Sequence, residues 1–218
     1  MKAFMVAGLV TMIGLPAANA AVITGVTATA SSSLTGFDRG VGHLVDGSGT
    51  DFSTGDTSNQ PDGTMWLNNG NGAYGGTADN SPSVTFNLGT QYALLGMTVW
   101  NYNEGTAPFT DRGIASADVY TSADGTVFTL LENVVLNQAP GTVTSFGQNV
   151  GLSGTAQYVR LSNLGQFVGD DSNFVGLSEV QFNGTPPVLE SPVPEPASMM
   201  LMGTGLLGLL ASRKRARS

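Results

Sequence analysis

The chain contains no cysteine and a single histidine, His43, among its 218 residues. Zinc, copper and iron centres are built mainly from these two residue types, so a transition-metal site is not expected. His43 would also have to be the base of any Ser-His-Asp nucleophile, and no Gly-x-Ser-x-Gly elbow accompanies it. Glycoside hydrolysis needs two carboxylates at a fixed separation, and the sequence singles out no such pair. We therefore expect a non-catalytic protein.

Basic residues are scarce away from the two ends of the chain. Three of the eight basic residues lie in the body of the chain, whereas all 16 acidic residues lie between positions 38 and 195. A surface of this charge is a poor partner for nucleic acid or an anionic membrane, and it suits cations and neutral polymers better. The three basic residues of the body are Arg39, Arg112 and Arg160.

The N-terminus has the pattern of a secretory signal. Lys2 precedes an apolar run from Ala3 to Leu15, and Ala18-Asn19-Ala20 provides the small residues that signal peptidase requires. We expect residues 1–20 to be a signal peptide and the mature chain to begin at Ala21. An internal N-terminal helix is the alternative.

The C-terminus combines a Pro-Glu-Pro triplet, an apolar stretch over residues 197–211 and a basic tail over residues 213–217. As a helix the apolar stretch spans only about 22 Å, against a hydrocarbon core of about 30 Å. The basic tail favours the cytoplasmic side. A short transmembrane helix with a firm stop suits temporary retention in the inner membrane.

This C-terminal arrangement resembles the sorting signal of PEP-CTERM proteins, whose motif here is Pro194-Glu195-Pro196. The resemblance implies an exosortase-type membrane protease, in addition to signal peptidase, as a processing partner. It also implies a Gram-negative bacterium that makes exopolysaccharide, with the cell surface or extracellular matrix as destination. The sorting signal then covers residues 194–218 and a linker covers residues 185–193. An ordinary tail anchor with an accidental triplet is the alternative.

The intervening residues 21–184 have a length typical of one domain. Val84, Phe86 and Leu88 alternate with polar residues, which is the period of a strand with one buried face. Similar short runs, separated by Gly, Asn, Asp and Ser, predict an all-β sandwich or barrel. The expected strands are 83–88, 94–102, 117–121, 128–131, 142–146, 157–161 and 177–182. Residues 36–76 read instead as long polar loops, either organised by a ligand or flexible.

In order, several segments resemble a discoidin-like, galactose-binding-like jelly-roll β-sandwich, the fold of coagulation-factor type C domains and many carbohydrate-binding modules. The resemblance spans residues 21–184 and includes a strand followed by a Ser-x-Asp-Gly turn and a closing Ser-Glu-Val-x-Phe strand. Its markers are residues 43–47, 65–67, 84–89, 119–125, 157–161 and 176–182. The expected architecture is therefore an all-β jelly roll between a signal peptide and a single transmembrane sorting helix.

The same resemblance implies a structural calcium ion held by the early Asp-Gly loop and the acidic residue of the final strand. Here these are Asp46 and Glu179, and the Thr50 hydroxyl with nearby carbonyls would complete the oxygen shell. Glu179 lies among apolar residues, where an uncompensated carboxylate would be costly. The alternative is that Glu179 pairs with Arg160 or Arg39.

A second group of residues has the composition of a sugar site. Recognition of sugars uses amides, carboxylates or arginine for hydroxyl pairs and an aromatic ring for the apolar face. The alternative is a structural loop in which Arg112 pairs with Glu104 or Asp111 and the aromatic residues belong to the core. The candidates are Trp100 or Tyr102 as platform, with Asn101, Asn103, Glu104, Asp111 and Arg112.

These observations favour an exported, non-catalytic protein that binds extracellular polysaccharide through a calcium-stabilised β-sandwich. The competing hypothesis is a purely structural biofilm or matrix protein without a ligand pocket.

Overall fold

The computed structural model describes residues 21–48, 64–105, 109–141, 147–168 and 173–187. These residues belong to the first of two units, Met1–Pro187, and the second is Val188–Ser218. The predicted signal peptide, the sorting signal with its apolar stretch, Thr50 and the expected strand 142–146 therefore lie outside the described residues. Within the described residues, no helix is both long and apolar enough to span a membrane.

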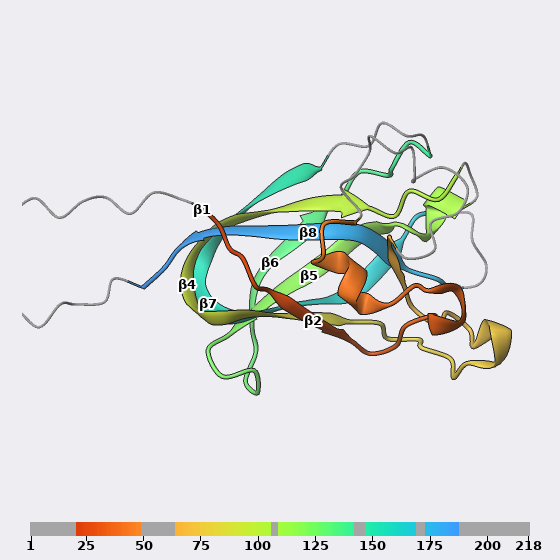
Figure 1. The fold of residues 1–218 in the computed structure, drawn as a ribbon, viewed down its shortest axis with the longest axis horizontal. Helices are drawn as coiled ribbons and strands as arrows, with labels where there is room; N and C mark the ends of the chain where they lie inside the picture. The colour runs from red at the N-terminus through yellow and green to blue at the C-terminus, as the bar shows by residue number, and fades with distance from the viewer. Residues whose placement is uncertain (1–20, 49–63, 106–108, 142–146, 169–172, 188–218) are drawn as a thin grey trace, which may run out of the picture. The chain divides into compact units, whose positions relative to one another are not determined.

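Antiparallel strands build the described domain, joined by short 3-10 helices (Figure 1). The strands run in the order β1-β8-β4-β7-β5-β6, with β2 paired to β4 and β3 paired to β8. The strands are β1 (Ala21–Val22), β2 (Thr27–Ala30), β3 (Trp66–Leu67), β4 (Val84–Asn101), β5 (Ile114–Ser122), β6 (Thr129–Val135), β7 (Gln148–Gln166) and β8 (Gly176–Thr185). The 3-10 helices are η1 (Thr35–Phe37), η2 (Val41–Leu44), η4 (Ala73–Gly75) and η5 (Phe109–Arg112).

The two longest strands bend, and this bend turns one sheet into a sandwich. The start of β4 pairs with β2 and the later part of β7, whereas its end pairs with β8 and the early part of β7. A register shift between Asn87 and Tyr92 separates the two parts, and Gly89 lies there at φ 84°. Because glycine adopts this conformation without steric cost, the chain turns there and remains paired. The two strands expected over 83–88 and 94–102 are thus one bent strand.

The core lies between the two layers that the bend creates. The alternation read from the sequence is present, since Val84, Phe86 and Leu88 are at most 2% exposed. Phe86 meets Phe182 of β8 edge to face, with ring centroids 5.1 Å apart. A second, smaller apolar cluster consists of Leu34, Met65, Leu67, Tyr102 and Phe174.

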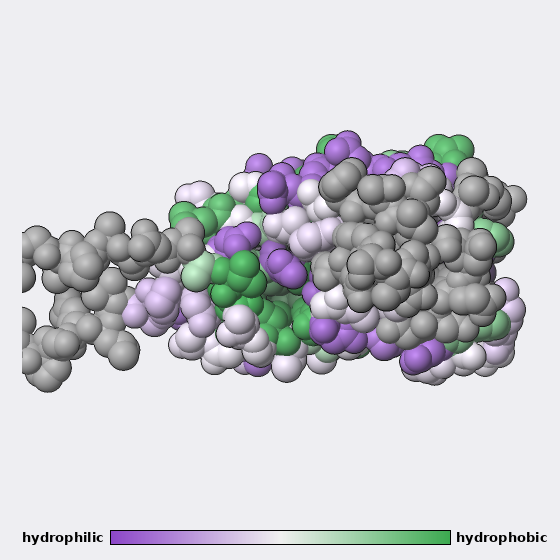
Figure 2. All heavy atoms as spheres, turned by 45° about the horizontal axis from the view of Figure 1, so that its top comes forward, coloured by the Kyte–Doolittle hydropathy of each residue, from purple (hydrophilic) through white to green (hydrophobic). Residues whose placement is uncertain are grey.

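The loops that carry the functional candidates lie at one end of the sandwich. Figure 1 shows η1, η4 and η5 together at the right, whereas β1 and the end of β8 lie at the left. The pairing of Ala21 with Gly184 brings the two ends of the domain side by side. On the coloured part of the face in Figure 2, hydrophilic and apolar side chains are mixed, and apolar side chains gather in a patch near the centre left. Exposed aromatic side chains include Phe37, Tyr74 and Phe109.

Candidate functional site

A pocket of about 170 Å³ opens among the loops at the η1, η4 and η5 end of the sandwich. We call it the loop pocket. Its floor is the smaller apolar cluster, which contributes Leu34, Leu67 and Phe174. The remaining lining residues are Phe37, Arg39, Tyr74, Glu104, Phe109 and Arg112.

Charged side chains form one side of the loop pocket. The Glu104 Oε2 atom lies 3.6 Å from Nη2 of Arg39 and 3.5 Å from Nη1 of Arg112. The Tyr102 hydroxyl donates a hydrogen bond to the same Glu104 oxygen. Because Arg39 is only 4% exposed, its charge would be costly to bury without a carboxylate. Glu104 therefore both stabilises the arginines and presents them to the pocket.

Aromatic rings form the other side. The Arg112 guanidinium lies 4.7 Å from the Phe109 ring centroid and 5.0 Å from that of Phe174. Phe37 and Tyr74 meet edge to face, with centroids 4.6 Å apart. Tyr74 is 72% exposed, so its ring is open to a ligand. The pocket combines flat apolar faces with a fixed arginine and carboxylate.

Tyr74 is held in an unusual backbone conformation. Its φ of 59° lies in the left-handed region, which costs a bulky residue roughly 1–3 kcal/mol and is concentrated at functional sites. Glycines flank η4, and Gly72 and Gly75 also have positive φ. The loop therefore places the Tyr74 ring at the rim of the loop pocket, although a bulky residue disfavours this positive φ.

Of the sugar-site residues expected from the sequence, Glu104 and Arg112 line the loop pocket. Asn101 does not, because it is 6% exposed and fully used inside the fold. Its Nδ2 group donates to the carbonyls of Ile114 (2.8 Å) and Asn137 (2.9 Å). Its Oδ1 atom accepts from the backbone N–H groups of Tyr102 and Ile114, both at 2.9 Å. Asn101 is a structural residue that ties three chain segments together.

The structure also buries three other candidates. Tyr102 is 0% exposed, so its ring is part of the core and offers no face to a sugar. Burial raises the pKa of the Tyr102 phenol well above its usual value. Asn103 is 1% exposed and accepts a hydrogen bond from the Gly141 N–H at 2.7 Å. Asp111 is 9% exposed and accepts one from Gln138 Nε2 at 2.6 Å.

Trp100, the other expected platform, faces a different part of the surface. Its indole covers Gly147, where an added Cβ would lie 2.7 Å from Trp100 Cε2. The aromatic residues that do line the pocket were not predicted from the sequence. Phe37 and Tyr74 each stand next to glycine in polar segments, and an isolated aromatic residue in such a loop is the signal that could have found them.

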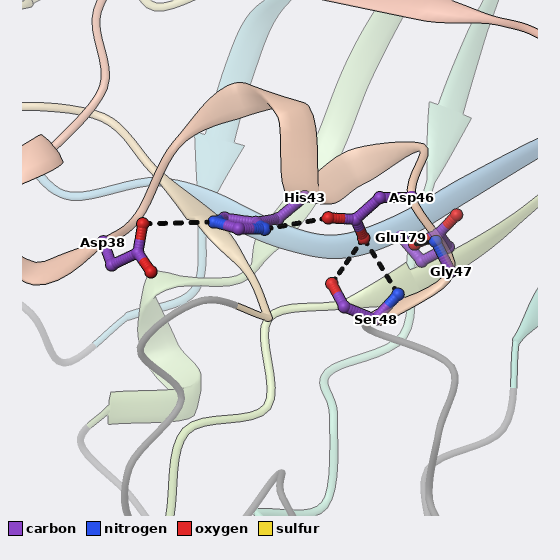
Figure 3. Close-up of polar contacts among 6 residues, drawn as sticks. All are labelled: Asp38, His43, Asp46, Gly47, Ser48 and Glu179. Atoms are coloured by element: carbon purple, nitrogen blue, oxygen red, sulfur yellow. Dashed lines mark hydrogen bonds and ion pairs between the residues drawn. The ribbon is translucent and has the colours of Figure 1, made fainter.

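The second candidate site joins the loop after η2 to β8 (Figure 3). The Gly47 N–H donates to Glu179 Oε2 at 3.1 Å, and Glu179 is 2% exposed. Asp46 Oδ1 accepts from the Ser48 N–H at 2.8 Å, and Oδ2 lies 3.0 Å from His43 Nδ1. Burial pushes the pKa of Asp46 upward, but hydrogen bonds from Ser48 and His43 outweigh it and hold that pKa below its usual value.

The donor set of this second site has the chemistry that calcium prefers. Asp46 and Glu179 line one cavity of about 260 Å³, and hard cations bind carboxylate and carbonyl oxygen. Among the described residues there is no group of three histidine or acidic side chains that could hold a metal, so loop carbonyls would have to supply further ligands. The two arginines considered as alternative partners of Glu179 have contacts of their own, Arg39 with Glu104 and Arg160 with Thr85.

The solved structures that resemble the domain include carbohydrate-binding modules and a lectin domain. The domain is similar to CpGH89CBM32-5 from Clostridium perfringens in complex with GalNAc-β-1,3-galactose (17% identity, TM-score 0.54, 74% of this chain and 99% of that chain). It is also similar to the family 32 carbohydrate-binding module of C. perfringens NanJ in complex with galactose (15% identity, TM-score 0.53, 76% and 99%). A third similar structure is the lectin domain of lectinolysin with Lewis B antigen (15% identity, TM-score 0.51, 75% and 96%).

The C-terminal segment matches a family by sequence. A search of the curated proteins finds no match to the chain. Residues 192–215 match the PEP-CTERM protein-sorting motif, which includes Pro194, Glu195 and Pro196. This chain thus carries a PEP-CTERM sorting motif behind a domain with the discoidin-like β-sandwich fold of family 32 carbohydrate-binding modules.

Proposed function

We propose that the domain binds a carbohydrate in the loop pocket and carries it on an exported, membrane-processed protein. The observation that supports this most is the combination of an exposed Tyr74 ring with the Glu104–Arg112 pair around one pocket of about 170 Å³. Pockets with apolar walls and a few fixed polar groups are typical ligand sites.

The two sides of the pocket match the two kinds of surface on a pyranose. Tyr74 and Phe37 offer apolar faces on which the C–H side of a sugar ring stacks. Arg112 donates hydrogen bonds and Glu104 accepts them, so together they recognise a pair of neighbouring hydroxyl groups. The aromatic stacking of Arg112 keeps its guanidinium oriented before the ligand arrives, which reduces the ordering cost of binding.

Binding without hydrolysis is the activity that the pocket supports best. Glycosidases use a general acid and a second carboxylate on opposite sides of the scissile bond. Among the described residues that line the loop pocket, Glu104 is the only carboxylate, and it is already engaged with two arginines and a tyrosine. It is better suited to accepting a hydroxyl than to donating a proton.

Calcium is proposed as a structural clamp at the second site. Asp46 and Glu179 would hold the ion with carbonyls of the same loop, tying η2 to the final strand. The contribution would be to stability, because the loop pocket is built from different residues.

The sorting motif supplies the setting of the proposed ligand. A PEP-CTERM motif implies export and processing at a membrane by an exosortase-type protease. We propose that this membrane is the inner membrane and that signal peptidase removes residues 1–20. We propose the cell surface or extracellular matrix of a Gram-negative bacterium as the destination and its exopolysaccharide as the ligand. A purely structural matrix protein would share the destination and lack the binding.

A glycan array tests the proposal directly. The full chain, purified in detergent, is expected to bind galactose-containing glycans, and Arg112→Gln is expected to reduce the signal at least tenfold. Gln157→Ala, a substitution in β7 away from the pocket, is the matched control and is expected to bind normally. If no glycan binds, the structural-protein hypothesis is favoured instead. If glycans bind and both variants bind them as the wild type does, the loop pocket is not the binding site.

A further inference from the structure

A second cluster of polar and aromatic side chains lies away from the loop pocket, on strands β5 and β7. In the β5–β7 ladder, Tyr120 lies opposite Arg160 and Asp118 lies opposite Ser162. Phe128 comes from the turn between β5 and β6, which Figure 1 shows at the end of the sandwich opposite η1, η4 and η5. The side chains surround a cavity of about 160 Å³, which we call the strand pocket; its lining residues are Tyr120, Phe128, Arg160, Ser162 and Asn163.

The Arg160 guanidinium is fixed in the strand pocket by two contacts. It lies 3.7 Å from the Phe128 ring centroid, and its Nε group donates to Thr85 Oγ1 at 2.9 Å. A cation against an aromatic face is stabilised, and the hydrogen bond through Nε orients the plane of the group. Arg160 is therefore preorganised, with little side-chain entropy left to lose on binding.

Arg160 differs from the other two arginines of the domain in having no carboxylate beside it among the described residues. Arg39 and Arg112 both lie within 4 Å of Glu104. Arg160 makes no ion pair with any carboxylate of the described residues, although acidic side chains outnumber basic ones in this domain. An anionic group on a ligand is the partner that would supply the missing charge.

The acidic residues nearby are committed to other contacts. Asp118 Oδ2 accepts from Asn163 Nδ2 at 2.5 Å, and Oδ1 accepts from Asn133. Asp124 accepts from the backbone N–H groups of Thr126 (2.8 Å) and Val127 (3.1 Å) within its own turn. Because these hydrogen bonds hold both carboxylates in place, neither of them forms an ion pair with the Arg160 guanidinium.

Hydroxyl groups complete the strand pocket. Tyr120 and Ser162 line it, and within the described part of the chain neither hydroxyl hydrogen-bonds to another side chain or to the backbone. Both are partly exposed and available to a ligand. A fixed guanidinium beside two hydroxyls matches a group that carries a carboxylate together with ring hydroxyls.

We infer that the strand pocket binds the carboxylate of a uronic acid residue in an acidic polysaccharide. Arg160 forms a two-pronged pair with the carboxylate, and Tyr120 and Ser162 contact its oxygens or the neighbouring hydroxyls. The site is separate from the loop pocket and does not depend on it. With a ligand in each pocket, one domain would bind two points of a polymer network. Its overall avidity would then exceed the affinity of either pocket alone.

Calorimetric titration of the full chain in detergent with a galacturonic acid hexamer tests this inference. The experiment is run in about 0.15 M salt, where repulsion between the acidic domain and the polyanion is screened beyond roughly 8 Å. We expect the hexamer to bind, Arg160→Gln to weaken it at least tenfold, and Tyr120→Phe, which removes one hydroxyl, to weaken it severalfold. Thr155→Ala, on the same strand, is the control and is expected to bind as the wild type does.

Two further titrants distinguish the strand pocket from the loop pocket and from unspecific attraction of a polyanion. A neutral galactose hexamer should bind Arg160→Gln as well as it binds the wild type, so failure of the loop-pocket proposal and failure of this one give different patterns. A glutamate hexamer should bind at least tenfold more weakly than the uronate. The inference is overturned if the uronate does not bind, if Arg160→Gln and Tyr120→Phe leave its binding unchanged, or if the glutamate hexamer binds equally well.

Discussion

Replacing Asn101 by leucine tests whether this residue belongs to the core or to the sugar site. The substitution keeps the size of the side chain and removes all four of its hydrogen bonds. It leaves two buried N–H groups, of Tyr102 and Ile114, without their acceptor. At roughly 1–3 kcal/mol for each stranded group, the expected loss of unfolding free energy is about 4 kcal/mol. For a domain of this size, that lowers Tm by about 12 °C.

Differential scanning calorimetry of Asn101→Leu and Asn149→Leu provides the comparison. Asn149 is exposed on β7 and accepts a single hydrogen bond from Thr98, so its replacement should change stability by no more than about 0.5 kcal/mol. Below its transition, Asn101→Leu should still bind galactose. Equal melting temperatures for the two variants would refute the structural role. A folded Asn101→Leu protein that has lost galactose binding would show that Asn101 belongs to the sugar site.

Three further substitutions test the charged groups. Glu104→Gln removes the carboxylate shared by Arg39 and Arg112 and should cost about 3 kcal/mol in urea unfolding; an unchanged midpoint would contradict the pairing. Calcium should raise the Tm of the wild type and EDTA should reverse the rise, whereas an equal rise in Glu179→Gln would exclude the clamp. Backbone hydrogen bonds from Thr126 hold the pKa of Asp124 well below its usual value, so Asp124→Asn should lower Tm at neutral pH. That difference should shrink below about pH 4, where the carboxyl protonates in the unfolded chain while it stays ionised in the folded protein, and a pH-independent difference would contradict it.

The alternating pattern was sufficient to predict most strands but not the way in which they connect. Val84, Phe86 and Leu88 alternate with polar residues and are buried as expected. The bend of β4 was read as a loop because Gly89 and its polar neighbours have the composition of a turn. Pairing on both sides keeps this segment in the sheet, and such tertiary pairing overrides local preference.

The early part of β7 was missed for a related reason. Gly151 and Gly154 interrupt its hydrophobic pattern, so residues 148–156 were not among the expected strands. In the structure Gly151 pairs with Gly96 and has open space around it, whereas a Cβ added at Gly154 would lie 3.0 Å from Leu131 Cδ1. Glycine in a strand is tolerated where a neighbouring chain approaches closely.

The candidate sugar site was half predictable. Glu104 and Arg112 were found because each follows or precedes a strand end, where polar side chains gather. Asn101 and Tyr102 have equally suitable chemistry, but the chain turns inward at the end of β4 and buries them. Tyr74 comes from a loop far away in sequence, and only the folded arrangement brings its ring to the same pocket.

Titration of galactose against Tyr74→Ala is the most direct test of the loop pocket as a carbohydrate site. Tyr74 is mostly exposed, so removing its ring should leave Tm nearly unchanged and affect mainly the ligand. Tyr158→Ala, a substitution of a tyrosine in β7, serves as the matched control. The account predicts at least a tenfold loss of galactose affinity in Tyr74→Ala, equivalent to about 1.4 kcal/mol, and none in Tyr158→Ala. Equal affinity in the two variants would contradict it.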